Sequence, residues 1–142
     1  MKSQVRWSLS LMMFLEYAAW GAWFPDLSVY MSRIGFSDSQ NGVIYSLLPL
    51  GCMLAPFIAG QIADRYFSSE RMMLVLHLAS AILMFSMARM TSYSSLWPLM
   101  FAWSLAYAPT LSLTNSLSFH HMPEAEKEFS LVRVWERSAG LW

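Results

Sequence analysis

Four long apolar segments alternate with short polar links along this chain of 142 residues. The segments run over residues 7–24, 41–63, 72–88 and 96–119. Each has the length of about 17 to 25 residues that a helix needs to cross a bilayer. Backbone groups inside a bilayer must be satisfied within their own segment, so we expect each segment to be a helix. The pattern predicts an all-α integral membrane protein.

The composition agrees with this prediction and narrows the classes of protein. Hydrophobic residues make up 56% of the chain and charged residues 13%, against about 25% charged in a soluble domain. The formal net charge is zero, so nothing in the charge balance favours a nucleic-acid partner. The lone cysteine, Cys52, excludes an intrachain disulfide, and we expect it to be a small core residue. The expected partner is the lipid bilayer.

Catalytic and metal-binding groups are scarce inside the apolar segments. Glu16 and His77 are the mid-span candidates for an intramembrane enzyme, and nothing in the sequence brings them together. No second histidine or cysteine lies at ligand spacing from His77, which we interpret as a packed, hydrogen-bonded residue rather than a proton relay. We therefore expect no enzyme activity, no metal and no cofactor.

Basic residues predict the orientation of the chain. Arg33 and Arg89 fall on one side of the bilayer, and a larger basic set falls on the other: Lys2, Arg6, Arg65, Arg71, Lys127 and Arg133. The side richer in lysine and arginine is the cytoplasmic side. We expect a cytoplasmic N-terminus and a cytoplasmic loop at residues 120–132.

A short charged turn from Gly60 to Arg71 joins the second and third segments. Asp64 lies at the carboxyl end of the second predicted helix, where the helix dipole repels an acid, so we expect it to serve a contact made elsewhere. The pattern of Gly60, Asp64 and Arg65, followed by Arg71, resembles the loop signature of the major facilitator superfamily of transporters. The resemblance implies that these four residues latch an inward gate.

The first segment contains an acid, Glu16, with Trp20 four positions later on the same helical face. A carboxyl in mid-bilayer is costly, which makes Glu16 a candidate for proton coupling; the alternative is a carboxyl kept for packing. Trp7 and Trp23 suit an interfacial belt. Trp20 lies deeper and is better placed to stack on a flat ligand.

The second and fourth segments carry small and polar residues in helical spacing. The second repeats a small residue at every fourth position, a close-packing pattern: Gly51, Ala55, Ala59 and Ala63. Pro49 and Pro56 should bend this helix. In the fourth segment, Tyr107 and Asn115 are large enough to face a water-filled path, and the alternative is hydrogen bonding between helices. The row Thr110, Thr114 and Ser118 also suits bonds across helices.

Two longer strings narrow the family. Residues 14–31 read F-L-E-Y-A-A-W-G-A-W-F-P-D-L-S-V-Y-M, and residues 106–118 read A-Y-A-P-T-L-S-L-T-N-S-L-S. With the Gly60 turn and the V-R-V-W of residues 132–135, they resemble the nucleoside:proton symporters of the major facilitator superfamily. The likeness covers residues 7–135.

The resemblance implies uptake of nucleosides, driven by the proton gradient, through the inner membrane. It implies a fold of about twelve helices in two halves, with alternating access to a midplane site. Arg133 matches an arginine that contacts the nucleoside in this family; the alternative is a positive-inside anchor. Glu16 stands where members carry glutamine, so the resemblance does not assign it a proton role.

The chain departs from the family in its length and its ending. We expect residues 1–142 to be a partial N-terminal half, truncated at the start of a fifth helix at residues 133–142. Its last residues, W-E-R-S-A-G-L-W, replace the Gly-Thr and apolar run that follow Trp135 in the family. Restoring one base after the Trp135 codon can produce W-G-T-I-G-W-L-V, so a frame shift is our hypothesis.

Two other interpretations stay open. A small four-helix multidrug exporter that works as a dimer would use an acid in its first helix, which Glu16 supplies. The long loop after residue 119 and the Gly60 turn count against it. The other interpretation is a remnant without activity.

Overall fold

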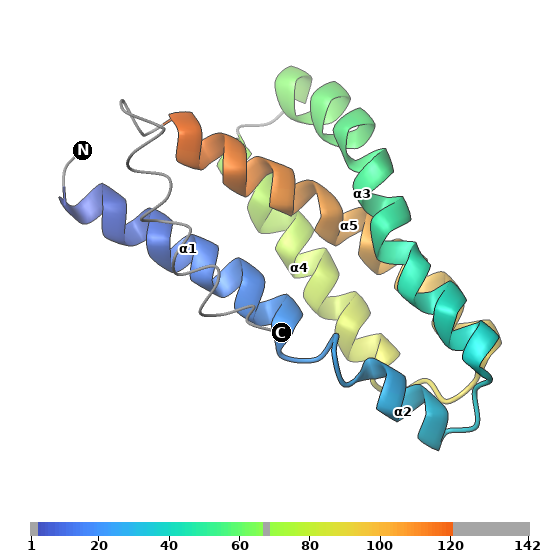
Figure 1. Ribbon diagram of the computed structural model, residues 1–142. Helices are drawn as coiled ribbons and strands as arrows, with labels where there is room; N and C mark the ends of the chain where they lie inside the picture. Colours follow the sequence, from blue (N-terminus) through green and yellow to red (C-terminus); the bar gives the residue numbers. More distant parts are fainter. Residues whose placement is uncertain (1–2, 67–68, 121–142) are drawn as a thin grey trace. The chain divides into compact units, whose positions relative to one another are not determined.

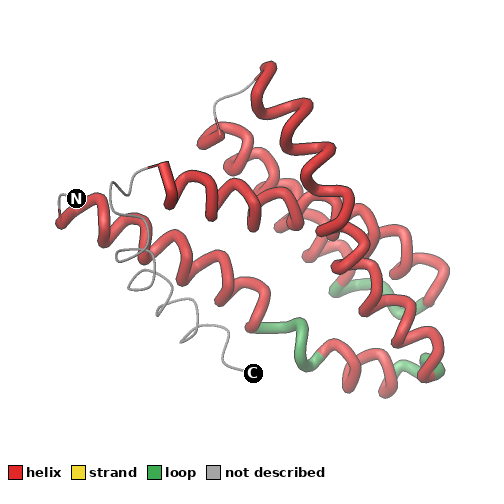
Figure 2. Tube along the Cα trace, turned by 45° about the horizontal axis from the view of Figure 1, so that its top comes forward, coloured by secondary structure: helices red, strands yellow, loops and turns green. Residues whose placement is uncertain are grey.

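Five helices make up the part of the chain that the computed structural model describes, residues 3–66 and 69–120, with side chains described for residues 7–57 and 70–119. They are α1 (Ser3–Gly21), α2 (Leu27–Arg33), α3 (Asp38–Tyr66), α4 (Ser69–Met87) and α5 (Tyr93–His120) (Figure 1). These described residues contain no strand (Figure 2). The all-α prediction is confirmed.

Each expected apolar segment lies mostly within one long helix, α1, α3, α4 or α5. Two boundaries differ from the prediction. The charged stretch that begins at Gly60 is helical up to Tyr66, because α3 continues through Asp64 and Arg65. The expected turn is therefore much shorter, since α4 begins at Ser69.

The short helix α2 lies in the polar link between the first two apolar segments, where no helix was predicted. It ends in a Schellman motif: Phe36 N donates to Met31 O at 3.0 Å, and Gly35 N donates to Ser32 O at 3.2 Å. Gly35 has a φ of 91°, a conformation that a side chain would disfavour. The glycine therefore ends α2 and redirects the chain toward α3.

A capping box fixes the first turn of α3. Gln40 N donates to Ser37 Oγ at 3.3 Å, and Ser37 N donates in return to Gln40 Oε1 at 2.9 Å. Asn41 Nδ2 donates to Ser32 Oγ at 3.2 Å, which ties the start of α3 to α2. The start of α3 is thus set by contacts between residues that lie within nine positions of one another in the sequence.

The chain forms two compact units. The first contains Met1–Val29 and Thr114–Trp142 in its described parts. In α1 it holds an apolar cluster of Leu9 and Met13, against which Met12 and Tyr17 pack. The second unit, Tyr30–Leu113, holds α3, α4 and most of α5.

Inside the second unit, α5 contacts both neighbouring helices. A Cβ added at Gly51 of α3 would lie 2.8 Å from the carbonyl oxygen of Ser104 in α5, so the two backbones nearly touch. The predicted close packing is confirmed at this position, and Ala55 is buried one turn later. Met72 of α4 and Leu113 of α5 form a second buried cluster, joined by Met73 and Leu76.

Prolines interrupt both helices that meet at Gly51. Pro49 and Pro56 lie inside α3, and Pro98 and Pro109 lie inside α5. Figure 1 shows α3 changing direction along its length, as expected from the hydrogen bonds that proline removes. Cys52 is exposed on α3, so the prediction of a core cysteine is wrong.

By length and hydropathy alone, one helical stretch in the described part of the chain is apolar enough to span a membrane, Glu70–Met87. The sequence pattern predicted four spans. The first segment contains Glu16, and the fourth is rich in hydroxyl, proline and aromatic residues. Residues of these kinds lower the mean hydropathy of a segment but do not prevent it from forming a helix.

Candidate functional site

Glu16 is almost completely buried in α1, with 2% of its surface exposed. Burying a carboxyl costs free energy unless the protein compensates it. Glu16 is thus the strongest acid candidate among the side chains that the structure describes.

Aromatic rings follow Glu16 toward the end of α1. The ring of Trp20 lies 5.2 Å from that of Phe24, centroid to centroid, and Trp23 meets Phe24 edge-on at 5.8 Å. The Trp20 indole Nε1 is buried and has no hydrogen-bond partner in the structure. An indole nitrogen can only donate, so this position has a donor available for an acceptor atom.

Tyr107 is buried inside the second unit rather than lining an open surface. Its ring stacks on Trp103 of the same helix, with centroids 4.7 Å apart and planes inclined by 13°. The backbone oxygen of Tyr107 accepts a bond of 2.7 Å from Thr110 Oγ1. The prediction noticed Tyr107 but missed Trp103, although the i, i+4 spacing of the two rings signals the pair.

The buried hydroxyl groups of α5 bond within their own helix. Ser104 Oγ donates to Phe101 O at 2.8 Å, and Ser118 Oγ donates to Thr114 O at 2.9 Å. Such back-bonding satisfies a hydroxyl locally. The bonds of Thr110 and Ser118 described here thus lie within α5, whereas the prediction expected bonds to other helices. Thr114 Oγ1 is buried and has no hydrogen-bond partner.

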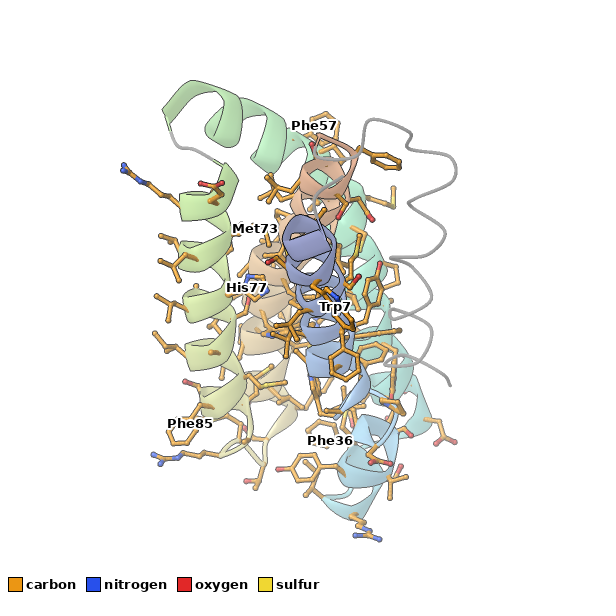
Figure 3. The ribbon with its side chains drawn as sticks, turned by 90° about the vertical axis from the view of Figure 1, so that its left-hand side faces the viewer. Trp7, Phe36, Phe57, Met73, His77 and Phe85 are labelled. Carbon is orange, nitrogen blue, oxygen red and sulfur yellow. The ribbon has the colours of Figure 1, made fainter. Side chains whose placement is uncertain are left out.

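His77 is half-buried on α4 (Figure 3). Its Nδ1 lies 2.9 Å from the backbone oxygen of Met73, one turn earlier. A carbonyl accepts, so this bond places a proton on Nδ1. The contact fits the expected hydrogen-bonded histidine.

The predicted gating residues lie around the junction of α3 and α4. Gly60, Asp64 and Arg65 belong to the last turns of α3, and their side chains lie outside the described ones. Arg71 is exposed in the first turn of α4. Arg133, the loop at residues 120–132 beyond His120, and the tail at 133–142 lie outside the described residues.

The structure brings two of the predicted site residues together on one element. Glu16 and Trp20 are one turn apart on the same face of α1. Asn115 is half-buried and belongs to the same compact unit as α1. Tyr107 and Arg71 belong to the other unit.

Comparison with known proteins identifies the family of this helical chain. The family model described as nucleoside H+ symporter matches residues 1–139. The chain belongs to the nucleoside H+ symporter family. This is a family of transporters rather than of enzymes. Its description as a nucleoside symporter family favours the symporter resemblance over a small multidrug exporter.

Proteins of Escherichia coli (strain K12) are similar to this family member in sequence. It is 41% identical to YegT over 126 residues, 89% of this chain and 30% of YegT. It is 29% identical to the nucleoside permease NupG over 132 residues, and 32% identical to xanthosine permease over 118 residues. The chain spans about 30% of the length of these relatives.

A solved structure has the same fold. The crystal structure of a point mutant of the nucleoside transporter NupG matches with a TM-score of 0.88 and 27% sequence identity. The match covers 96% of this chain and 35% of the NupG chain. The fold prediction, part of a major facilitator fold, is confirmed.

Proposed function

We propose that this chain acts in a membrane transporter that takes up nucleosides together with protons. The observation that carries the proposal is the family match over residues 1–139. The likeness to NupG, at a TM-score of 0.88, supports it. Transport proceeds by alternating access about a midplane site, as in other major facilitator folds.

Trp20, Tyr107, Asn115 and Arg133 contact the nucleoside in this proposal. Trp20 offers a ring for stacking and an indole donor that has no partner in the structure. The ring of Tyr107 is held by Trp103, which leaves its orientation fixed while a substrate binds nearby. Arg133 contributes a charged fork of donors suited to the oxygens of a base or ribose.

Glu16 carries the transported proton in this proposal, a role particular to this chain, because the family resemblance places glutamine at this position. Its burial, one turn from Trp20 on the same face of α1, supports this role. An intramembrane acid is a functional candidate by default. The coupled species are then one nucleoside and the proton that Glu16 carries.

The junction of α3 and α4 forms the inward gate. Three of its residues, Gly60, Asp64 and Arg65, lie in the last turns of α3, and Arg71 lies in the first turn of α4. In this proposal the protein lies in the inner membrane, with its N-terminus and the gate on the cytoplasmic side. The excess of lysine and arginine on the side of the N-terminus supports this orientation.

The test is a chimera of NupG in which residues 1–139 of this chain replace the matching segment, called the NupG chimera below. It is expressed in a strain that lacks its own nucleoside uptake, and uptake of labelled uridine is measured. We expect saturable uptake well above that of cells with an empty vector. A chimera that reaches the membrane in normal amounts and takes up no uridine would contradict the proposal.

A further inference from the structure

One face of α4 exposes a row of large apolar side chains. The exposed fractions lie between 57% and 68% for Leu74, Val75, Leu78, Ile82 and Phe85. Exposure of this much contiguous apolar surface marks a contact with an apolar partner. The same helix is the described one that is long and apolar enough to span a membrane.

Arginines mark the two ends of this row. Arg71 and Arg89 are both exposed, and they lie 18 residues apart, since 89 − 71 = 18. At a rise of 1.5 Å per residue this separation is about 27 Å, close to the bilayer core of about 30 Å. The charged ends therefore fall at the depth of the two headgroup layers.

Arg89 is held in place at the end of the apolar row. Its guanidinium carbon lies 4.4 Å from the centre of the Phe85 ring, a cation–π contact. Figure 3 shows Phe85 on the outer side of α4, directed away from the other helices of its unit. In the described part of the chain no carboxylate pairs with Arg89, so its donors are available to an anion.

We propose that Leu78, Ile82, Phe85 and Arg89 of α4 form a binding site for one anionic phospholipid. The lipid phosphate accepts hydrogen bonds from the Arg89 guanidinium, whose planar fork matches phosphate oxygens. The acyl chains lie along Phe85, Ile82 and Leu78. One leaflet is about 15 Å deep, which corresponds to about 10 residues of helix, the distance from Arg89 to Leu78.

The choice of an anionic lipid follows from charge. A neutral apolar row would accept any acyl chain, so Phe85 and Ile82 alone give no preference for a headgroup. The Arg89 guanidinium lies at headgroup depth and pairs with no carboxylate in the described part of the chain. It therefore attracts a lipid with a net negative charge more strongly than a zwitterionic lipid. The site lies on the side opposite the predicted gate and goes beyond the proposed function, since it depends on insertion in a membrane and not on the transported substrate.

The experiment uses the full chain, purified in mild detergent and offered equal amounts of phosphatidylglycerol and phosphatidylcholine. Native mass spectrometry gives the ratio of the two lipids bound to the protein. We expect phosphatidylglycerol to be preferred about fivefold, the effect of one arginine near an anionic surface. Arg89→Gln should abolish the preference, whereas Arg89→Lys should keep part of it because it keeps the charge without the fork.

Arg33→Gln is the matched control. Arg33 is exposed, belongs to the same unit and lies on the same predicted side of the membrane, so this variant removes the same charge elsewhere. It should keep the full preference, and circular dichroism should show equal helix content in all variants. The proposal would be overturned if Arg89→Gln kept the preference for phosphatidylglycerol, or if Arg33→Gln lost as much of this preference as Arg89→Gln. Displacement of the bound lipid by inorganic phosphate would also overturn it. Uridine uptake by the NupG chimera is a separate readout, so failure of either proposal is distinguishable.

Discussion

Glu16 and Trp20, the residues proposed to carry the proton and to stack on the nucleoside, lie one turn apart in α1. The carboxyl of Glu16 is buried, and the buried indole N–H of Trp20 has no hydrogen-bond partner. A polar group that lacks such a partner costs free energy in an apolar setting. The sequence predicted both positions from helical spacing, whereas the orphan donor of Trp20 could not be predicted, because hydrogen bonding depends on neighbours distant in sequence.

Glu16→Gln in the NupG chimera tests the proton role at the residue scale. Glutamine has nearly the same shape but cannot exchange a proton at neutral pH. We expect uridine to equilibrate across the membrane without accumulating, so the ratio of internal to external uridine should fall to about one. Accumulation equal to that of the unmodified chimera would show that Glu16 serves packing.

Two substitutions at Trp20 separate stacking from hydrogen bonding. Trp20→Ala removes the ring and should raise the KM for uridine by about fivefold to a hundredfold, from a loss of about 1–3 kcal/mol of stacking. Trp20→Phe keeps a ring and removes the donor, which should cost about 1 kcal/mol, or about fivefold in KM. Trp7→Phe is the control, because Trp7 is exposed at the start of α1 and should have no effect on KM. A KM unchanged in Trp20→Ala would remove Trp20 from the site.

Helices α3 and α5 show how a sequence pattern can predict a packing face without its partner. The spacing of Gly51 and Ala55 predicted close packing, and the structure supplies the partner, the backbone of Ser104. Periodicity identifies the face of one helix only. The same limit explains α2, which is too short for a periodic signal and is fixed by Gly35 and by its bonds to the next helix.

Gly51→Ala should destabilise the contact between α3 and α5. The added Cβ would lie 2.8 Å from the Ser104 oxygen, so the helices must move apart, at a cost of about 1–3 kcal/mol. This cost exceeds the gain in helix propensity of about 1 kcal/mol.

Gly42→Ala is the matched control on the same helix. Nothing lies within 4 Å of its added Cβ, so only the propensity gain acts and stability should rise slightly. Thermal unfolding in detergent, followed by circular dichroism, compares the two variants. Equal melting temperatures for Gly51→Ala and the unmodified chain would contradict the close approach.

At the scale of the whole molecule, local strings carried more information than composition. The apolar segments predicted helices in a membrane, but hydropathy alone singles out Glu70–Met87 among the described helices. The strings at residues 14–31 and 106–118 indicated the family, which the match over residues 1–139 confirms. The partner that each helix meets inside the second unit could not be predicted, because contacts between distant segments leave no periodic trace in the sequence.

The most direct test of the central claim follows uridine and protons together. Cells that express the NupG chimera are placed in weakly buffered medium, and external pH is recorded while labelled uridine is added. We predict that the medium becomes more alkaline as uridine enters, and that a protonophore abolishes both accumulation and the pH change. Uridine accumulation without proton movement, unaffected by the protonophore, would contradict a nucleoside:proton symporter.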